Sequence, residues 1–154
     1  MPEAELMLFE KLNVSDTKKS IVLRSCELPK AADLNDGREL PSLLKTLGYD
    51  VIKEGYATNK RRFVRGKGDC STSYTKEWHS RGLHICYGSE NFWPSYLRFC
   101  ICASKGREEE VYRIAKEMER QMTESARGYV EKNPSERKNI LKMMPTLQAQ
   151  VARS

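Results

Sequence analysis

The sequence predicts a single α+β domain in which a mainly antiparallel sheet of about four to five strands carries helices on one face. Three observations lead to this expectation. The length of 154 residues fits one hydrophobic core. Short segments between residues 20 and 104 alternate apolar and polar side chains, as strands do. From Arg107 onward the apolar spacing becomes helical, which predicts two C-terminal helices.

The first third of the chain predicts a helix, a strand, a loop and a second helix. Residues 1–18 open with acidic and apolar residues at helical spacing, which favours a short N-terminal helix. The sequence SIVLR, Ser20 to Arg24, is typical of a strand. Turn residues, above all Asn35-Asp36-Gly37, predict a loop after it. Pro41 suits the first turn of a leucine-rich helix, and Gly48 suits its end.

Residues 49–104 predict the rest of the sheet. YDVIKEGYAT and KRRFVR are expected to be strands, and the polar stretch 66–82 is expected to be a loop with at most one short element near its end. GLHICYG and SYLRFCICAS predict two further strands around SENFWP. In the second of these, alternation places one apolar set on one face: Leu97, Phe99, Ile101 and Ala103.

The C-terminal third predicts helices. Acidic residues at 108–110 suit the positive N-terminal end of a long helix, and Gly128 is expected to fray or end it. Asn133 and Pro134 predict the start of a last helix. Pro145 predicts a kink or stop, which leaves 145–154 as a helical extension or as a flexible or docking tail. The long helix is expected to bury one stripe: Val111, Ile114, Ala115, Met118, Met122 and Tyr129.

Positive charge is concentrated in the middle of the chain. The net charge is +6. Residues 60–104 hold 8 basic and 3 acidic side chains, which gives +5 for this segment. A concentrated basic patch can steer an anionic partner, whereas scattered charge mainly serves solubility.

The basic stretch NKRRFVRGKG lies among hydroxyls and aromatics, a combination typical of single-stranded nucleic-acid binding. The sequence therefore predicts a nucleic-acid-binding protein, RNA favoured, that works by electrostatic capture and stacking with little base readout. A purely structural interpretation stays open, in which the cations only protect a solvated edge strand from aggregation. The candidate binding residues are Lys60, Arg61, Arg62, Arg65, Lys67, Tyr74, Lys76, Trp78, Trp93 and Arg98.

Two other function classes stay open. An adaptor or inhibitor would grip a protein partner through the aromatic loop 89–98 and the C-terminal helices, because aromatic and arginine side chains are common hot spots. The methionine-rich C-terminal end also fits a homodimer seam. The third interpretation is an enzyme of Cys–His type, for which His84 and Cys86 would share one strand face. The preferred expectation is a protein without catalytic residues.

The cysteine and histidine pattern predicts neither a metal site nor a cofactor. Structural zinc sites use paired knuckles, and no cysteine pair has a spacing that matches His79 and His84. The five cysteines follow no regular framework, and the N-terminal stretch lacks the layout of a signal peptide, so reduced thiols and a cytoplasmic or nuclear location are expected. The longest apolar run, residues 6–9, is too short to span a membrane.

Overall fold

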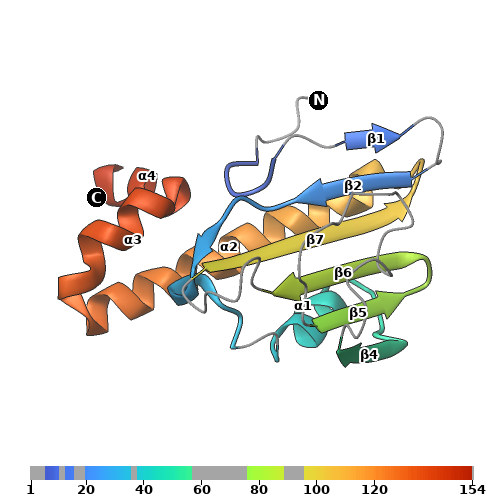
Figure 1. The fold of residues 1–154 in the computed structure, drawn as a ribbon, viewed down its shortest axis with the longest axis horizontal. Helices are drawn as coiled ribbons and strands as arrows, with labels where there is room; N and C mark the ends of the chain where they lie inside the picture. The colour runs from blue at the N-terminus through green and yellow to red at the C-terminus, as the bar shows by residue number, and fades with distance from the viewer. Residues whose placement is uncertain are drawn as a thin grey trace.

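The computed structural model describes residues 6–10, 13–15, 20–35, 38–56, 76–88 and 96–153. It confirms the α+β class, with an antiparallel sheet and helices packed behind it (Figure 1). The strands are β1 (Asn13–Ser15), β2 (Ser20–Arg24), β3 (Leu28–Pro29), β4 (Lys53–Tyr56), β5 (Lys76–Ser80), β6 (Leu83–Gly88) and β7 (Tyr96–Ser104). The helices are α1 (Leu40–Thr46), α2 (Glu108–Lys132), α3 (Arg137–Met143) and α4 (Pro145–Arg153), with 3₁₀ turns η1 (Lys30–Ala32) and η2 (Pro134–Glu136).

The sheet is larger than the sequence predicts. Its strand order is β1-β2-β7-β6-β5-β4, and the short β3 also pairs with β7, which makes seven strands among the described residues. Every one of these pairings is antiparallel. The nine-residue β7 lies inside the sheet: β6 pairs with its residues 98–102, β2 with 100–104 and β3 with 96–97.

One face of the sheet forms the hydrophobic core with the helices. Trp78, Ile85, Ile101 and Leu23 lie in one register row across β5, β6, β7 and β2, and all four are buried. Helices α1 and α2 cover this face (Figure 1). The predicted leucine face of α1 is confirmed, because Leu40, Leu43 and Leu44 are buried. The side of α2 that is turned to the core carries Val111, Ile114, Ala115, Met118, Met122, Ala126 and Val130.

One expectation about segments 6–10 and 76–80 is wrong, and another is only partly right. Residues 6–10 are not helical: Phe9 forms an isolated β-bridge with Ser25, and the backbone N–H of Leu8 donates to the Glu119 carboxylate at 2.7 Å. Segment 76–80, where at most one short element was expected at the end of a loop, is the five-residue strand β5, paired on both sides. The strand expected over KRRFVR lies outside the described residues.

Helix α2 is longer than its glycine suggests. It runs 25 residues, passes Gly128 and ends at Lys132, where the Asn133 side-chain amide donates to the carbonyl of Tyr129 at 3.0 Å. Tyr129, assigned to the buried stripe from the sequence, is instead 41% exposed. Within the described part of the chain, neither this helix nor any other has the combination of length and apolar character that a bilayer crossing requires.

Two basic side chains of α2, Arg120 and Arg127, are paired with acids one turn away. Arg120 forms an ion pair with Glu117 at 2.6 Å, and Arg127 pairs with Glu124. These i,i+3 pairs stabilise a helix by themselves and reduce the net field of its outer side.

The chain end folds back as helix rather than as a loose tail. Pro145 starts α4 directly after α3, so the break that proline predicts is confirmed. Leu147 and Met144 are buried in the core, and the hydroxyls of Thr146 and Thr123 lie 2.6 Å apart. Residues 145–153 are therefore docked against α2.

A tight turn joins β5 to β6 and sets the register between them. Ser80 pairs with Leu83, so Arg81 and Gly82 form a two-residue loop with φ values of 37° and 79°. Positive φ at both positions is the signature of a type I′ turn, whose twist matches that of the flanking strands. The Arg107 guanidinium secures this turn by donating to the Arg81 carbonyl at 2.8 Å.

Gly82→Ala is expected to destabilise the fold by about 1 to 2 kcal/mol, because an L side chain is strained at positive φ. The added Cβ would also lie 3.1 Å from Arg107 Nη1. Gly128→Ala is the matched control, since its Cβ meets no atom within 4 Å and a helical alanine should stabilise by about 0.5 to 1 kcal/mol. Urea denaturation of both variants measures the difference, and an unchanged midpoint for Gly82→Ala would contradict the turn assignment.

Arg107 also forms a polar cluster with the start of α2. Its guanidinium binds the Glu110 carboxylate through two hydrogen bonds of 3.1 and 2.8 Å, and the Tyr49 hydroxyl donates to the same carboxylate at 2.5 Å. These donors, Arg107 first, lower the pKa of Glu110 from its ordinary value of 4.5 to about 2. The cluster ties the hairpin turn, α2 and the segment after α1 together.

Because the pKa of Glu110 is lower in the folded chain than in the unfolded chain, its contribution to stability is present above pH 4.5 and is lost as the pH falls to about 2. We expect Glu110→Gln to be less stable than the wild type at pH 6 and to match it near pH 2. Urea denaturation of both proteins across this range is the measurement. A stability difference that stays constant with pH would contradict the assignment.

Candidate functional site

The long basic segment begins and ends at one point of the sheet. β4 and β5 are antiparallel neighbours, and Tyr56, the last residue of β4, pairs with Lys76, the first residue of β5. Segment 57–75, which holds the basic stretch, is therefore anchored at both ends beside the same register pair. Its own residues lie outside the described part of the chain.

The aromatic segment is anchored at the same end of the sheet. Gly88, the last residue of β6, pairs with Arg98 near the start of β7, and segment 89–95 connects these two strands. Lys76 pairs with Tyr87, one residue from the end of β6. In Figure 1 the arrowheads of β4 and β6 and the tails of β5 and β7 are the left-hand ends of these four strands. Both segments therefore leave the sheet at one end.

The candidate binding residues divide into two groups. Most of them, namely Lys60, Arg61, Arg62, Arg65, Lys67, Tyr74 and Trp93, lie outside the described residues. Lys76, Trp78 and Arg98 belong to described strands. Lys76 lies half-buried at the sheet end where the basic segment re-enters.

Trp78 does not fit the predicted stacking role. Its side chain is 1% exposed and packs on the core side of β5, with its ring centroid 6.3 Å from that of Tyr87. The sequence analysis placed this residue near a loop, where it could be exposed, but strand alternation turns it inward. Among the described residues, no acceptor is within hydrogen-bond distance of its indole N–H. Trp78 is therefore a core residue in this structure.

Arg98 is engaged by acidic neighbours. Its guanidinium lies 4.0 Å from the Glu10 carboxylate and 3.7 Å from the Glu27 carboxylate. These contacts connect β7 to the N-terminal segment and to the residues before β3. The two carboxylates also offset part of the positive charge of Arg98, which was expected to bind phosphate. Arg98 is therefore a supporting residue at most.

The sheet face opposite the helices, here called the outer face, carries the sulfur and imidazole side chains. Two neighbouring register rows cross it. The cysteines in these rows are buried, and the Sγ atoms of Cys100 and Cys102 lie 3.5 Å apart. The four described cysteines, Cys26 included, are not joined in disulfides, and burial raises the pKa of Cys26. One row holds His79, His84 and Cys102, and the other holds Glu77, Cys86 and Cys100.

Glu77, His79 and His84 converge on the outer face at the β5–β6 hairpin. The Nε2 atoms of both histidines lie 3.3 Å from Glu77 Oε2. The two imidazoles are stacked, with centroids 4.1 Å apart and planes 23° apart. Three potential metal-ligand atoms thus lie within 4.8 Å of one another. We call these three residues the Glu-His-His cluster.

The sequence does not predict this cluster, because the spacing of its histidines matches no zinc knuckle and residues 66–82 are expected to form a loop with at most one short element. One sequence signal could have indicated the cluster. Glu77 and His79 are two residues apart, and His84 follows the potential turn residues Arg81 and Gly82. An arginine in the first position of a type I′ turn is uncommon, since that position favours asparagine, aspartate or glycine. The hairpin was therefore hidden.

The geometry gives little support to a Cys–His catalytic pair. His84 and Cys86 do lie two residues apart on one side of β6, as the sequence predicts. A nucleophilic thiol has to reach its substrate, and Cys86 is fully buried. The arrangement therefore favours a packing role for this thiol.

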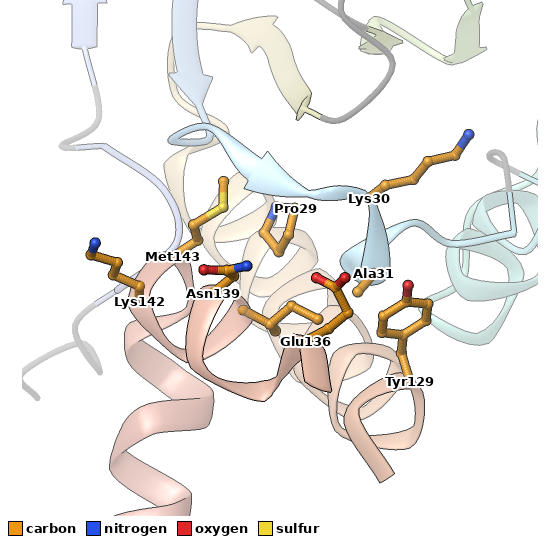
Figure 2. A pocket seen from close by; sticks show the side chains of 9 residues that line it. Pro29, Lys30, Ala31, Tyr129, Glu136, Asn139, Lys142 and Met143 are labelled. Carbon is orange, nitrogen blue, oxygen red and sulfur yellow. The ribbon is translucent and has the colours of Figure 1, made fainter. Parts of the chain in front are cut away.

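A groove of about 730 Å³ lies between η1 and the C-terminal helices. Figure 2 shows Pro29 and Ala31 on one wall and Tyr129, Asn139 and Met143 on the other. The walls are mixed in character, since Lys30, Glu136 and Lys142 contribute to them as well. Among the described lining residues Tyr129 is the aromatic one, and its side chain is exposed.

No protein-family model, no curated protein and no solved structure matches this chain. Its function therefore has to be inferred from its own residues.

Proposed function

We propose that this protein binds nucleic acid, RNA in preference to DNA, at the sheet end where segments 57–75 and 89–95 are anchored. The supporting observation is the register of the strands. Because Tyr56 pairs with Lys76 and Gly88 pairs with Arg98, the most basic and the most aromatic segments of the chain leave the sheet side by side. Cations beside stacking rings are the combination that single-stranded nucleic acid requires.

In this proposal the phosphates are held by cationic side chains of the basic segment, and the bases stack on Tyr74 and Trp93. Trp78 has no part in it, since it belongs to the core, and Lys76 and Arg98 support the base of the surface. Base readout is limited, because the contacts are electrostatic and stacking contacts. The phosphate-binding residues are Lys60, Arg61, Arg62, Arg65 and Lys67.

The proposal is tested by fluorescence anisotropy with short single- and double-stranded RNA and DNA at several salt concentrations. For single strands, log affinity should fall with log salt at a slope of about −0.7 per neutralised phosphate, so three to five contacts give about −2 to −3.5. Single-stranded RNA should bind most tightly. An absence of binding at low salt would contradict the proposal and leave the basic stretch as a solvated edge.

A second candidate is an adaptor or inhibitor that binds a protein partner, or a second copy of the chain, and the groove beside Tyr129 favours it. Point mutations distinguish the two candidate functions. If the partner is a protein, Trp93→Ala and Tyr129→Ala should reduce its capture by the immobilised chain, while Arg61→Glu with Arg62→Glu should leave capture intact. If the partner is RNA, Tyr129→Ala should leave binding unchanged.

A further inference from the structure

We propose that Glu77, His79 and His84 form a binding site for a divalent zinc ion on the outer face of the sheet. The site differs from the nucleic-acid surface proposed above, because its two histidines lie on a sheet face beside the Arg81-Gly82 turn, toward the end of β5 opposite to Lys76. The chain contains two histidines in all, and both belong to this cluster.

The backbone brings the three residues together before any ligand binds. Glu77 and His79 are two residues apart on β5, so both side chains point to the outer face. His84 on β6 is the direct register partner of His79, and such cross-strand partners have Cβ atoms only about 4.5 to 5.5 Å apart. The turn at Arg81-Gly82 fixes this register. The cluster therefore depends on backbone geometry that the core already stabilises.

The two distances between the Glu77 carboxylate and the imidazoles fit tetrahedral coordination, and all three ligand atoms lie within 4.8 Å of one another. Zinc bonds nitrogen at about 2.0 to 2.1 Å, so two ligand atoms at a tetrahedral angle lie about 3.3 to 3.4 Å apart. Both Nε2 to Oε2 distances are 3.3 Å. A charge-assisted hydrogen bond between the same groups would be shorter, about 2.7 to 2.9 Å. Zinc lies in the plane of each imidazole that binds it, so the stacked rings, now 23° from parallel, would open on binding.

The chemistry and the exposure of the donors also favour zinc. Two imidazole nitrogens and one carboxylate oxygen suit a borderline ion such as zinc, whereas calcium and magnesium prefer oxygen ligands only. The side chains of His79, His84 and Glu77 are 35%, 15% and 14% exposed, so an ion can enter from solvent. Three protein ligands leave a fourth position for water or for the thiol of Cys102, which lies opposite His84 in the register.

The competing explanation is that Glu77 only accepts hydrogen bonds from the two imidazoles. The test is isothermal titration of the EDTA-treated, reduced chain with zinc chloride, together with NMR of ¹⁵N-labelled histidine. We expect one ion per chain and a shift of both imidazole signals in parallel. A cobalt titration should give the visible absorption of a tetrahedral site. No stoichiometric binding by one millimolar zinc would overturn the proposal.

Variants distinguish binding at this site from binding by the cysteines, because thiolates in general are also zinc ligands. Loss of a second-shell partner of a metal ligand costs about 10- to 100-fold in affinity, so His79→Ala, His84→Ala and Glu77→Gln should each weaken binding by at least about tenfold. Glu54→Gln, an exposed acid on β4, is the matched control and should leave the affinity unchanged. Full binding by the His79→Ala and His84→Ala double variant would assign the ion to thiols and overturn the proposal. Circular dichroism in EDTA checks that each variant is folded.

Discussion

Replacing Arg61 and Arg62 with glutamate is expected to weaken binding to single-stranded RNA by about 100-fold or more at low salt. Two phosphate contacts are lost, and two repulsive charges replace them. With about 0.7 per contact, the salt slope should also become shallower by about 1.4. Anisotropy titrations of wild type and variant over the same salt series measure both quantities.

The matched control carries the same charge change at another place. Arg120→Glu with Arg127→Glu alters the outer side of α2, where both arginines are paired with acids in the wild type. We expect this control to change RNA affinity only a few-fold, because it alters the distant field and not a contact. If both double variants weaken binding equally, net charge alone would explain the affinity, and the assigned surface would be wrong.

Trp78→Ala is expected to destabilise the chain by about 3 to 5 kcal/mol, the usual cost of removing a large buried ring. The ring is 1% exposed and lies in the central row of the core with Ile85 and Ile101. This cost is a large part of the total stability of a typical domain. Urea unfolding with a linear extrapolation measures it.

Trp93→Ala provides the contrast to this core substitution. A stacking residue should contribute about 1 to 3 kcal/mol to RNA binding and little to stability. Trp78→Phe keeps an apolar ring and should lose much less stability than Trp78→Ala. If Trp78→Ala left stability unchanged and abolished RNA binding, the burial of Trp78 would be irrelevant in solution, and the stacking role first assigned to it would stand.

The sequence predicted those features of the fold that depend only on residues within one helix or strand. The alternation of β7, the leucine face of α1 and the break at Pro145 were all visible, because each depends on residues within one element. β5 was not visible, since its outer-face residues are polar and it buries only Trp78 and Ser80. Its strand state depends on pairing with β4 and β6, which no single segment encodes.

Long-range contacts account for the remaining errors. Residues 6–10 have helical spacing, yet the buried carboxylate of Glu119, 111 positions away, accepts the backbone N–H of Leu8. A hydrogen bond of this kind competes with helix formation and cannot be read from the segment itself. Burial raises the pKa of Glu119, whereas the backbone donors lower it. The Glu-His-His cluster was missed for a similar reason, since the register of a hairpin brings its members together.

The central claim is that segments 57–75 and 89–95 form one RNA-binding surface at a single sheet end. Photo-crosslinking to a short single-stranded RNA that contains 4-thiouridine, followed by peptide mapping, tests this claim most directly. We expect crosslinks in both segments, with Tyr74 and Trp93 among the modified residues. Crosslinks confined to the C-terminal helices, or found in one segment and unaffected by Arg61→Glu with Arg62→Glu, would contradict it.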